Sequence, residues 1–277
     1  QRVACSQTLA CAMPYHEPTI LERRAMGSLV RLTLHAPDLA RAARPGQAVL
    51  VRCAPSESDD PLLRRPLFLA GADPATDTIE LLLAPLERGL AWLATQPIGA
   101  RLDCYGPIGT GFTLDGRARN LLLAGAGPAV PALLFLARVA AARAAVVLLI
   151  AATEAALTPP PFLLPSDVEY MTSDAGDASL SALLGGAHRV PLPALAGTPL
   201  AWADQLFLAL TEPLVTPLST VVRAGRLRWE RGFAQAILAG AMPCGFGVCL
   251  GCLVETRDGA RLRCKDGPVF DLRDLNR

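Results

Sequence analysis

The chain has 277 residues, of which 52% are hydrophobic and 18% are charged, and its formal net charge is +1. This composition excludes an intrinsically disordered protein and predicts globular domains with large cores. A net charge near zero excludes attraction to nucleic acid or to anionic membranes through a strong positive field. The longest apolar run, residues 121–137, is interrupted by Gly and Pro and is shorter than the ~20 residues of a membrane-spanning helix.

The eight cysteines fall into two sets. Four lie in a C-terminal run, whereas Cys5, Cys11, Cys53 and Cys104 are scattered and are expected to be buried free thiols. The N-terminus shows no basic patch followed by an apolar region, so no signal peptide is expected. Both observations predict a protein of the reducing cytoplasm.

Residues 1–115 carry the pattern of an antiparallel β domain. Short segments that mix apolar and polar residues are separated by turn residues. The expected strands are residues 19–24, 29–34, 48–52, 78–83 and 99–105, with a short helix at 88–93 and a loop at 106–112. This organisation predicts a small antiparallel β-barrel.

The pattern changes in residues 116–232, where buried strands alternate with helices. The expected strands are residues 121–124, 145–152, 168–173 and 206–210, and the expected helices are 130–142 and 218–223. This alternation predicts a doubly wound parallel sheet. Gly125 and Gly127 follow the first strand, where glycine suits phosphate binding at a helix N-terminus. A tight turn needs glycine with or without a ligand, so this signal is weak alone.

Residues 233–277 form a third expected module, which holds a cysteine run with the spacing C-x4-C-x2-C-x11-C. This spacing is typical of a plant-type [2Fe–2S] cluster. The expected ligands are Cys244, Cys249, Cys252 and Cys264. Glycines between them allow a tight loop whose N–H groups can point at the sulfurs. A four-thiolate zinc site is an alternative, although such sites usually have two short C-x2-C pairs, and disulfides are a further one.

Four stretches in chain order resemble a known family. They are Pro-Gly-Gln at 45–47, Arg-Arg-Pro at 64–66, Gly-Pro-Ile-Gly-Thr-Gly-Phe at 106–112, and the cysteine-rich residues 244–270. Together they are similar to the electron-transfer subunits of class 1B dihydroorotate dehydrogenases, within the ferredoxin–NADP reductase superfamily.

The resemblance implies a flavoprotein oxidoreductase of pyrimidine biosynthesis. In that family FAD binds the barrel, NAD binds the α/β sheet, and the cluster passes electrons to an FMN-containing partner that oxidises dihydroorotate. The implied FAD residues are Arg65, Pro66, Leu67, Phe68, Leu83, Gly89 and Leu90, and the implied NAD residues are Gly125 and Gly127. No catalytic side chain is expected in this chain, because the substrate is oxidised in the partner.

The sequence departs from the family at both nucleotide sites. Phe68 replaces a serine that helps to hold the flavin, and residues 87–90, Glu-Arg-Gly-Leu, replace the pyrophosphate-binding G-x-G-T. Pro128 and Ala129 alter the glycine-rich turn, and Glu212 stands in the segment that replaces C-G-P near the nicotinamide. FAD binding is therefore an open expectation and NAD binding a doubtful one. The alternative is a cluster-bearing or structural subunit that has lost one or both nucleotides.

Overall fold

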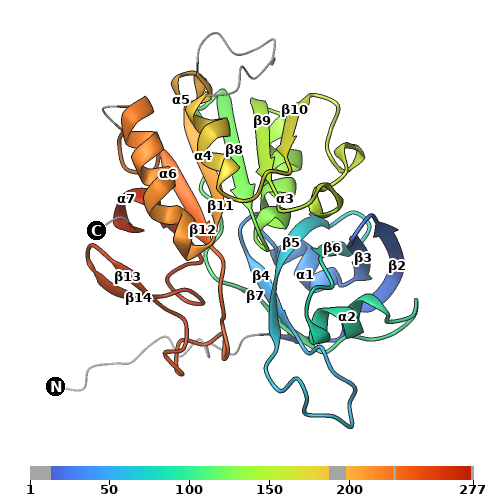
Figure 1. The fold of residues 1–277 in the computed structure, drawn as a ribbon. Coiled ribbons are helices and arrows are strands. Elements are labelled where there is room, and N and C mark those ends of the chain that lie inside the picture. Colours follow the sequence, from blue (N-terminus) through green and yellow to red (C-terminus); the bar gives the residue numbers. More distant parts are fainter. Residues whose placement is uncertain (1–13, 187–197, 227–228, 276–277) are drawn as a thin grey trace, which may run out of the picture.

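The computed structural model describes residues 14–186, 198–226 and 229–275. Cys5 and Cys11, which are expected to be buried free thiols, lie outside these residues. Figure 1 shows a curled N-terminal sheet beside an α/β sheet, with the cysteine-rich segment at the edge of both. None of the described helices has the length and apolar character needed to cross a bilayer.

A curled antiparallel sheet forms the N-terminal part. Its strands are β1 Tyr15–His16, β2 Thr19–Met26, β3 Leu29–His35, β4 Ala48–Val51, β5 Arg65–Asp73, β6 Thr78–Leu83 and β7 Cys104–Ile108. They pair in the order β1-β7-β4-β5-β6-β3-β2. The helices α1 Pro37–Ala42 and α2 Arg88–Ala94 lie in the connections. The side chains that alternate inward along these strands build one core, which includes Leu32, Leu34, Leu69 and Leu81.

The two end strands of this sheet come close to each other. β1 and β2 are consecutive in the chain, and the N–H of Ile20 donates to the carbonyl of Ala100 at 2.9 Å. The N–H of Leu102 likewise donates to the carbonyl of Pro18 at 2.9 Å. The expected barrel thus takes the form of a curled sheet whose ends are joined by a few backbone hydrogen bonds.

The last strand of this sheet differs from the expected one. Residues 99–105 were expected as a strand and 106–112 as a loop, but β7 runs from Cys104 to Ile108. Its pairing with β4 carries the strand through Gly106, where an added Cβ would lie 2.9 Å from Val49 Cγ1. The glycine thus allows a close approach of two strands, and breaker residues that predict a loop are instead part of the sheet.

The second sheet has six strands, with the order β10-β9-β8-β11-β12-β15. They are β8 Asn120–Ala126, β9 Ala145–Ala151, β10 Val168–Ser173, β11 Gln205–Leu210, β12 Ala234–Leu238 and β15 Val269–Asp271. The first five are parallel, whereas β15 pairs antiparallel with β12. The expected parallel sheet is therefore a mixed one, because the chain returns to the sheet edge after the cysteine-rich segment.

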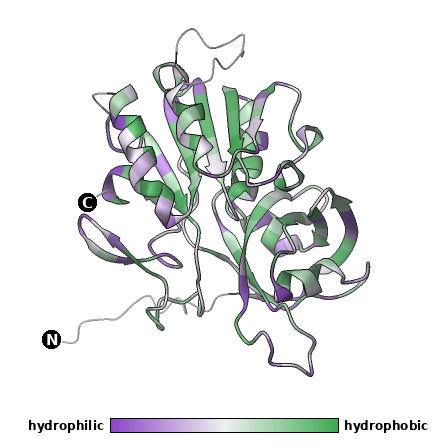
Figure 2. Ribbon diagram, viewed as in Figure 1, coloured by the Kyte–Doolittle hydropathy of each residue, from purple (hydrophilic) through white to green (hydrophobic). Residues whose placement is uncertain are grey.

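Helices cover both faces of this sheet. They are α3 Val130–Ala141, α4 Ser179–Gly185, α5 Pro199–Trp202, α6 Glu212–Gly225 and α7 Leu272–Leu275, with the short 3-10 helices η1 Ala155–Leu157 and η2 Pro161–Leu163. Leu121 and Leu123 pack on the α3 side, and Leu122 packs on the side of α4 and α6, which Figure 1 shows together over one face. Successive side chains of a strand point to opposite faces, so continuously apolar strands fit a sheet buried on both sides. Figure 2 shows these central strands in the hydrophobic colour.

Helix α3 joins the two sheets. Phe135 packs into the core of the curled sheet, whereas Leu134 belongs to a core to which both sheets contribute. Arg138 donates to the Glu80 carboxylate at 2.6 Å and to the carbonyl of Leu163 at 2.8 Å. The helix therefore fixes the α/β sheet against the curled sheet by apolar packing and by a partly buried ion pair.

The cysteine-rich segment is an excursion from the α/β sheet. It leaves after β12, forms the antiparallel hairpin of β13 Leu253–Thr256 and β14 Gly259–Leu262, and returns as β15. The boundaries proposed from the sequence, at 115/116 and 232/233, stay predictions. After the boundary at 232/233, both β12 and β15 are hydrogen-bonded into the α/β sheet. The two ends of the cysteine-rich excursion are therefore anchored in that sheet.

Candidate functional site

The loop of residues 244–252 folds tightly and brings the cysteines together in two pairs. Gly245 and Gly247 adopt φ values of 73° and 81°, and Leu250 adopts 57°. The thiol of Cys249 hydrogen-bonds to Cys244, and the Sγ atoms of Cys252 and Cys264 lie 3.4 Å apart. Two thiolates bound to one tetrahedral metal at about 2.3 Å would lie roughly 3.8 Å apart, which is close to this separation.

Backbone N–H groups are directed at the sulfurs. The N–H of Phe246 donates to Cys244 Sγ and that of Gly251 donates to Cys249 Sγ, each at 3.4 Å. Burial opposes ionisation of Cys244, but backbone hydrogen bonds from Cys249 and Phe246 outweigh it and lower the pKa of this thiol to about 6. The loop therefore stabilises a thiolate, which is the form that binds metal.

The second pair lies deeper in the protein. Cys252 and Cys264 are buried, whereas Cys249 is exposed. Burial, followed by the hydrogen bond shared with Cys252, raises the pKa of Cys264 to about 12. A bound metal would supply the positive charge that a thiolate needs at this position.

The pairing bears on the kind of metal centre. Among the described residues, no set of three or more His, Cys, Asp or Glu side chains converges on a single metal position. A mononuclear zinc site requires such a set, whereas each iron of a [2Fe–2S] cluster takes two protein ligands and shares inorganic sulfide with the other. The two thiol pairs are therefore compatible with a two-iron cluster.

A cavity of about 430 Å³ lies between the curled sheet and the start of α3. Seven of the expected cofactor residues line it, namely Arg65, Pro66, Leu67, Phe68, Leu83, Leu90 and Gly127. The structure thus brings together most of the expected FAD residues and one expected NAD residue. The cavity sits at the carboxyl ends of β8 and β9, where open α/β sheets usually bind their ligands.

The two other expected cofactor residues do not line the cavity. A Cβ at Gly125 would lie 2.8 Å from both Ala209 Cβ and Leu133 Cδ1, so this glycine allows β8, β11 and α3 to pack closely. A Cβ at Gly89 would lie 3.0 Å from the Cβ of Cys53, under the start of α2. Packing alone therefore accounts for glycine at both positions.

Sequence reasoning missed a second group of lining residues. They are Leu29, Leu82, Ala84, Leu86, Val130, Pro131, Ile150, Ala151, Ala152, Thr153, Leu157, Pro159 and Asp177. Glu87 and Pro128, which the sequence marks as departures from the family, also line the cavity. Many of the missed residues follow the carboxyl ends of β8 and β9, and this position in a parallel sheet is the signal that could have found them. Most are apolar, so the cavity suits a flat apolar ring system with few polar contacts.

Phe68 and Arg65 define two sides of the cavity. Phe68 is only 3% exposed and packs in the core with Leu50 and Ile108, and its ring offers no hydrogen-bonding group. The guanidinium of Arg65 is held by Glu87, with Nε to Oε1 at 3.0 Å and Nη2 to Oε2 at 2.8 Å. Most of the expected flavin residues therefore lie in one place. Phe68, however, offers no polar group, and the guanidinium of Arg65 is already bound by Glu87.

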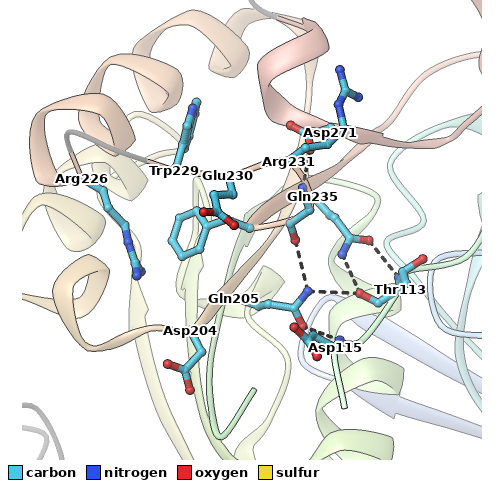
Figure 3. Close-up of a pocket in the computed structure, with 12 residues that line it drawn as sticks. Thr113, Asp115, Asp204, Gln205, Arg226, Trp229, Glu230, Arg231, Gln235 and Asp271 are labelled. Atoms are coloured by element: carbon cyan, nitrogen blue, oxygen red, sulfur yellow. Dashed lines mark hydrogen bonds between the residues drawn. The ribbon is translucent and has the colours of Figure 1, made fainter. Parts of the chain in front are cut away.

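A larger cavity, of about 750 Å³, opens at the other end of the α/β sheet (Figure 3). It lies at the amino ends of β11 and β12, where Gln205 and Gln235 hydrogen-bond to the backbone of Thr113. Its Arg231 is bound by both carboxylate oxygens of Asp274, at 2.6 and 2.7 Å. These polar groups join segments of the protein to one another, and this end of a parallel sheet is not the usual ligand side.

Residues 240–276 match the iron–sulfur cluster binding domain of dihydroorotate dehydrogenase B. The chain is 30% identical over 253 residues to the electron transfer subunit of dihydroorotate dehydrogenase B (NAD(+)) of Shouchella clausii, covering 88% of this chain and 91% of that one. It is 31% identical over 262 residues to the corresponding subunit of Geobacillus thermodenitrificans, covering 91% and 95%.

Solved structures show the same fold at lower identity. A structure of an NADH-dependent reduced ferredoxin-NADP oxidoreductase superposes with a TM-score of 0.74 at 18% identity, covering 94% of this chain and 89% of that one. A ferredoxin reductase in carbazole 1,9a-dioxygenase gives 0.59 at 20% identity, covering 81% and 67%. The expected reductase-like fold and the expected iron–sulfur domain are confirmed by these matches. The chain therefore belongs to the family of electron-transfer subunits of dihydroorotate dehydrogenase B.

Proposed function

We propose that this chain passes electrons one at a time between a flavin in the cavity beside Arg65 and a [2Fe–2S] cluster held by Cys244, Cys249, Cys252 and Cys264. The observation that carries the proposal is the arrangement of the four thiols as two pairs, with N–H groups directed at two of the sulfurs. A flavin takes up electrons as a pair and releases them singly, and a two-iron cluster carries one. The chain thus joins a two-electron reaction to single-electron transfer.

The partner we propose is an FMN-containing dehydrogenase that oxidises dihydroorotate in the cytoplasm. The exposed Cys249 lies among the exposed apolar side chains of Phe246, Val248 and Leu250. Apolar side chains gathered around an exposed redox ligand suit a protein contact that excludes water. The relatives are named as electron transfer subunits, which supports substrate oxidation in the partner rather than in this chain.

Direct reaction with a nicotinamide is the weaker part of this proposal. The relatives are named for NAD(+), and the Gly127 turn lies in the cavity wall with a φ of 78°. Pro128, however, has no N–H group to offer a phosphate. Anaerobic mixing with NADH tests this step, because bleaching of a flavin or cluster band supports it and an unchanged spectrum contradicts it.

The cluster assignment is tested by a matched pair of substitutions. Cys249→Ala should remove most of the iron and the visible absorption, since it deletes one of the four proposed ligands. Cys53→Ala removes a buried thiol outside the loop and should leave the iron content unchanged. Equal iron content in both variants and the unchanged protein would contradict the assignment of Cys249.

A second candidate function is a cluster-bearing subunit that binds no nucleotide. The observation that favours it is the engagement of Arg65 by Glu87, together with the apolar Phe68 beside it. Flavin released by denaturing the purified complex separates the two candidates. One flavin per chain supports electron transfer from a flavin, whereas an intact cluster without flavin supports the second candidate.

A further inference from the structure

The cavity beside Arg65 is poor in charge. Among the described residues that line it, only Arg65, Glu87 and Asp177 are ionisable, and Arg65 is the only cation. The lining therefore carries more negative than positive charge. Any phosphate of a ligand placed here would depend on Arg65 for its charge partner, because a buried or partly buried anion needs one.

Arg65 is already bound within the protein. Its two hydrogen bonds to Glu87 form a bidentate pair, and the side chains are 26% and 39% exposed. The hydrogen bond from Arg65 lowers the pKa of Glu87, and the same bond raises the pKa of Arg65. Both groups are therefore charged at neutral pH. The guanidinium has its planar edge turned to a carboxylate, which is the geometry that it would use for a phosphate.

The backbone holds Glu87 in this place. Its carboxylate also accepts from the N–H of Gly89 at 3.1 Å and from that of Leu90 at 2.8 Å. Four N–H donors thus converge on a single carboxylate at the cavity wall. To free Arg65, a ligand would have to break its two hydrogen bonds to Glu87, which the backbone N–H groups hold in place, and a third from Nη1 to the carbonyl of Leu63 at 2.6 Å.

We propose that Glu87 is an internal anion that occupies Arg65, so that the cavity selects the uncharged ring system of a flavin and gains little from its phosphates. This inference rests on the proposed flavin function and deepens it. Binding in this cavity comes mainly from apolar contact with the ring, and the phosphate-bearing arm of FAD remains outside the reach of Arg65. The protein then distinguishes weakly between a flavin with phosphates and one without them.

The test compares FAD with riboflavin, which has the same ring system and no phosphate. Flavin-depleted protein with its cluster intact is titrated with each, and binding is followed by flavin fluorescence. The unchanged protein should bind both with similar affinity. Glu87→Gln removes the negative charge that competes for the guanidinium and should raise the affinity for FAD about tenfold while leaving that for riboflavin nearly unchanged.

Two further variants make the comparison specific. Glu87→Ser keeps an oxygen that can accept the backbone N–H groups at the start of α2, but it leaves no carboxyl or amide group for Arg65. Asp60→Asn removes a carboxylate that pairs with Arg88 at the same helix start, and it does not free Arg65. It should leave the affinity for both flavins unchanged, which separates release of Arg65 from a general change in charge.

The outcomes are distinct. A higher affinity for FAD, with an unchanged affinity for riboflavin, in Glu87→Ser or Glu87→Gln supports the role of Glu87. If flavins bind but neither variant has a higher affinity for FAD than the unchanged protein, the role of Glu87 is overturned. The proposed flavin site is not contradicted by that result. Failure of every form to bind either flavin overturns both the role of Glu87 and the proposed flavin site.

Discussion

The guanidinium of Arg263 donates to the carboxylate of Glu212 at 2.8 Å and so joins the cysteine-rich segment to the end of β11. Arg263 is 4% exposed, directly precedes Cys264, and also donates to the carbonyl of Ala241 at 3.2 Å. A Cβ at Gly240 would lie 2.6 Å from the guanidinium, so glycine at this position lets Arg263 pack closely against the backbone. Glu212 and Ala241 thus anchor the cysteine-rich segment through Arg263.

Loss of this anchor should loosen the cluster segment. Arg263→Gln removes a buried guanidinium and leaves its partners unpaired, so we expect destabilisation of about 1–3 kcal/mol and faster loss of iron to a chelator. Arg261→Gln changes an exposed arginine two residues away and should have little effect on either measurement. Equal rates of iron loss in the two variants would show that Arg263 does not hold the segment.

The pair of Arg65 and Glu87 should make stability depend on acid pH. The hydrogen bond from Arg65 lowers the pKa of Glu87 below its ordinary 4.5. The contribution of this pair to the free energy of unfolding is therefore fully present above the unfolded-state pKa of Glu87. It is lost as the pH falls through the lower pKa that Glu87 has in the folded protein. Urea unfolding at pH 7 should show Glu87→Gln to be less stable than the unchanged protein, and this difference should shrink near pH 3. A difference that grows in acid would contradict the pairing.

The glycine that ends the first strand of the α/β sheet should be needed for packing. Gly125→Ala places a methyl group against Ala209 and Leu133, and overpacking of this kind typically costs about 1–3 kcal/mol. Gly116→Ala is the control, since no atom lies within 4 Å of its added Cβ. Denaturant unfolding of both variants measures the difference. A destabilisation of Gly125→Ala no larger than that of Gly116→Ala would refute the packing role.

The apolar surface around the cysteine loop should bind the partner. Val248 is 75% exposed beside Cys249, and Leu62, at 73%, belongs to the loop that precedes β5 and lies outside the cysteine-rich segment. Val248→Asp should weaken binding to the partner at least tenfold while preserving the visible spectrum of the cluster, because it places a charge in a contact that excludes water. Leu62→Asp should change neither. Titration calorimetry with the purified partner compares them, and matching affinities for the two variants would rule out this surface.

Much of the architecture follows from local pattern. The four strands predicted for the α/β sheet, β8 to β11, occur within one or two residues of their predicted positions, because each is a short apolar run bounded by turn residues. The buried strand β12 was not predicted. The cysteine spacing likewise indicates the metal-binding loop. These features depend on residues that are neighbours in the chain, so they can be inferred without knowing the fold.

Other features depend on distant partners. β15 is three residues long, and its pairing with β12 is set by where the chain returns after the cysteine-rich segment. The bond between Arg65 and Glu87 joins residues 22 positions apart, and nothing in the local sequence indicates that one neutralises the other. The α/β sheet is therefore predictable and the electrostatics of the cavity are not, because tertiary contacts alone decide which charges meet.

Iron and sulfide analysis of the anaerobically purified protein, combined with electron paramagnetic resonance after reduction, tests the central claim most directly. The paired thiols of Cys244 with Cys249 and of Cys252 with Cys264 predict two irons and two sulfides per chain, and a paramagnetic signal that appears only on reduction. A colourless protein with one zinc per chain and no signal after reduction would contradict it.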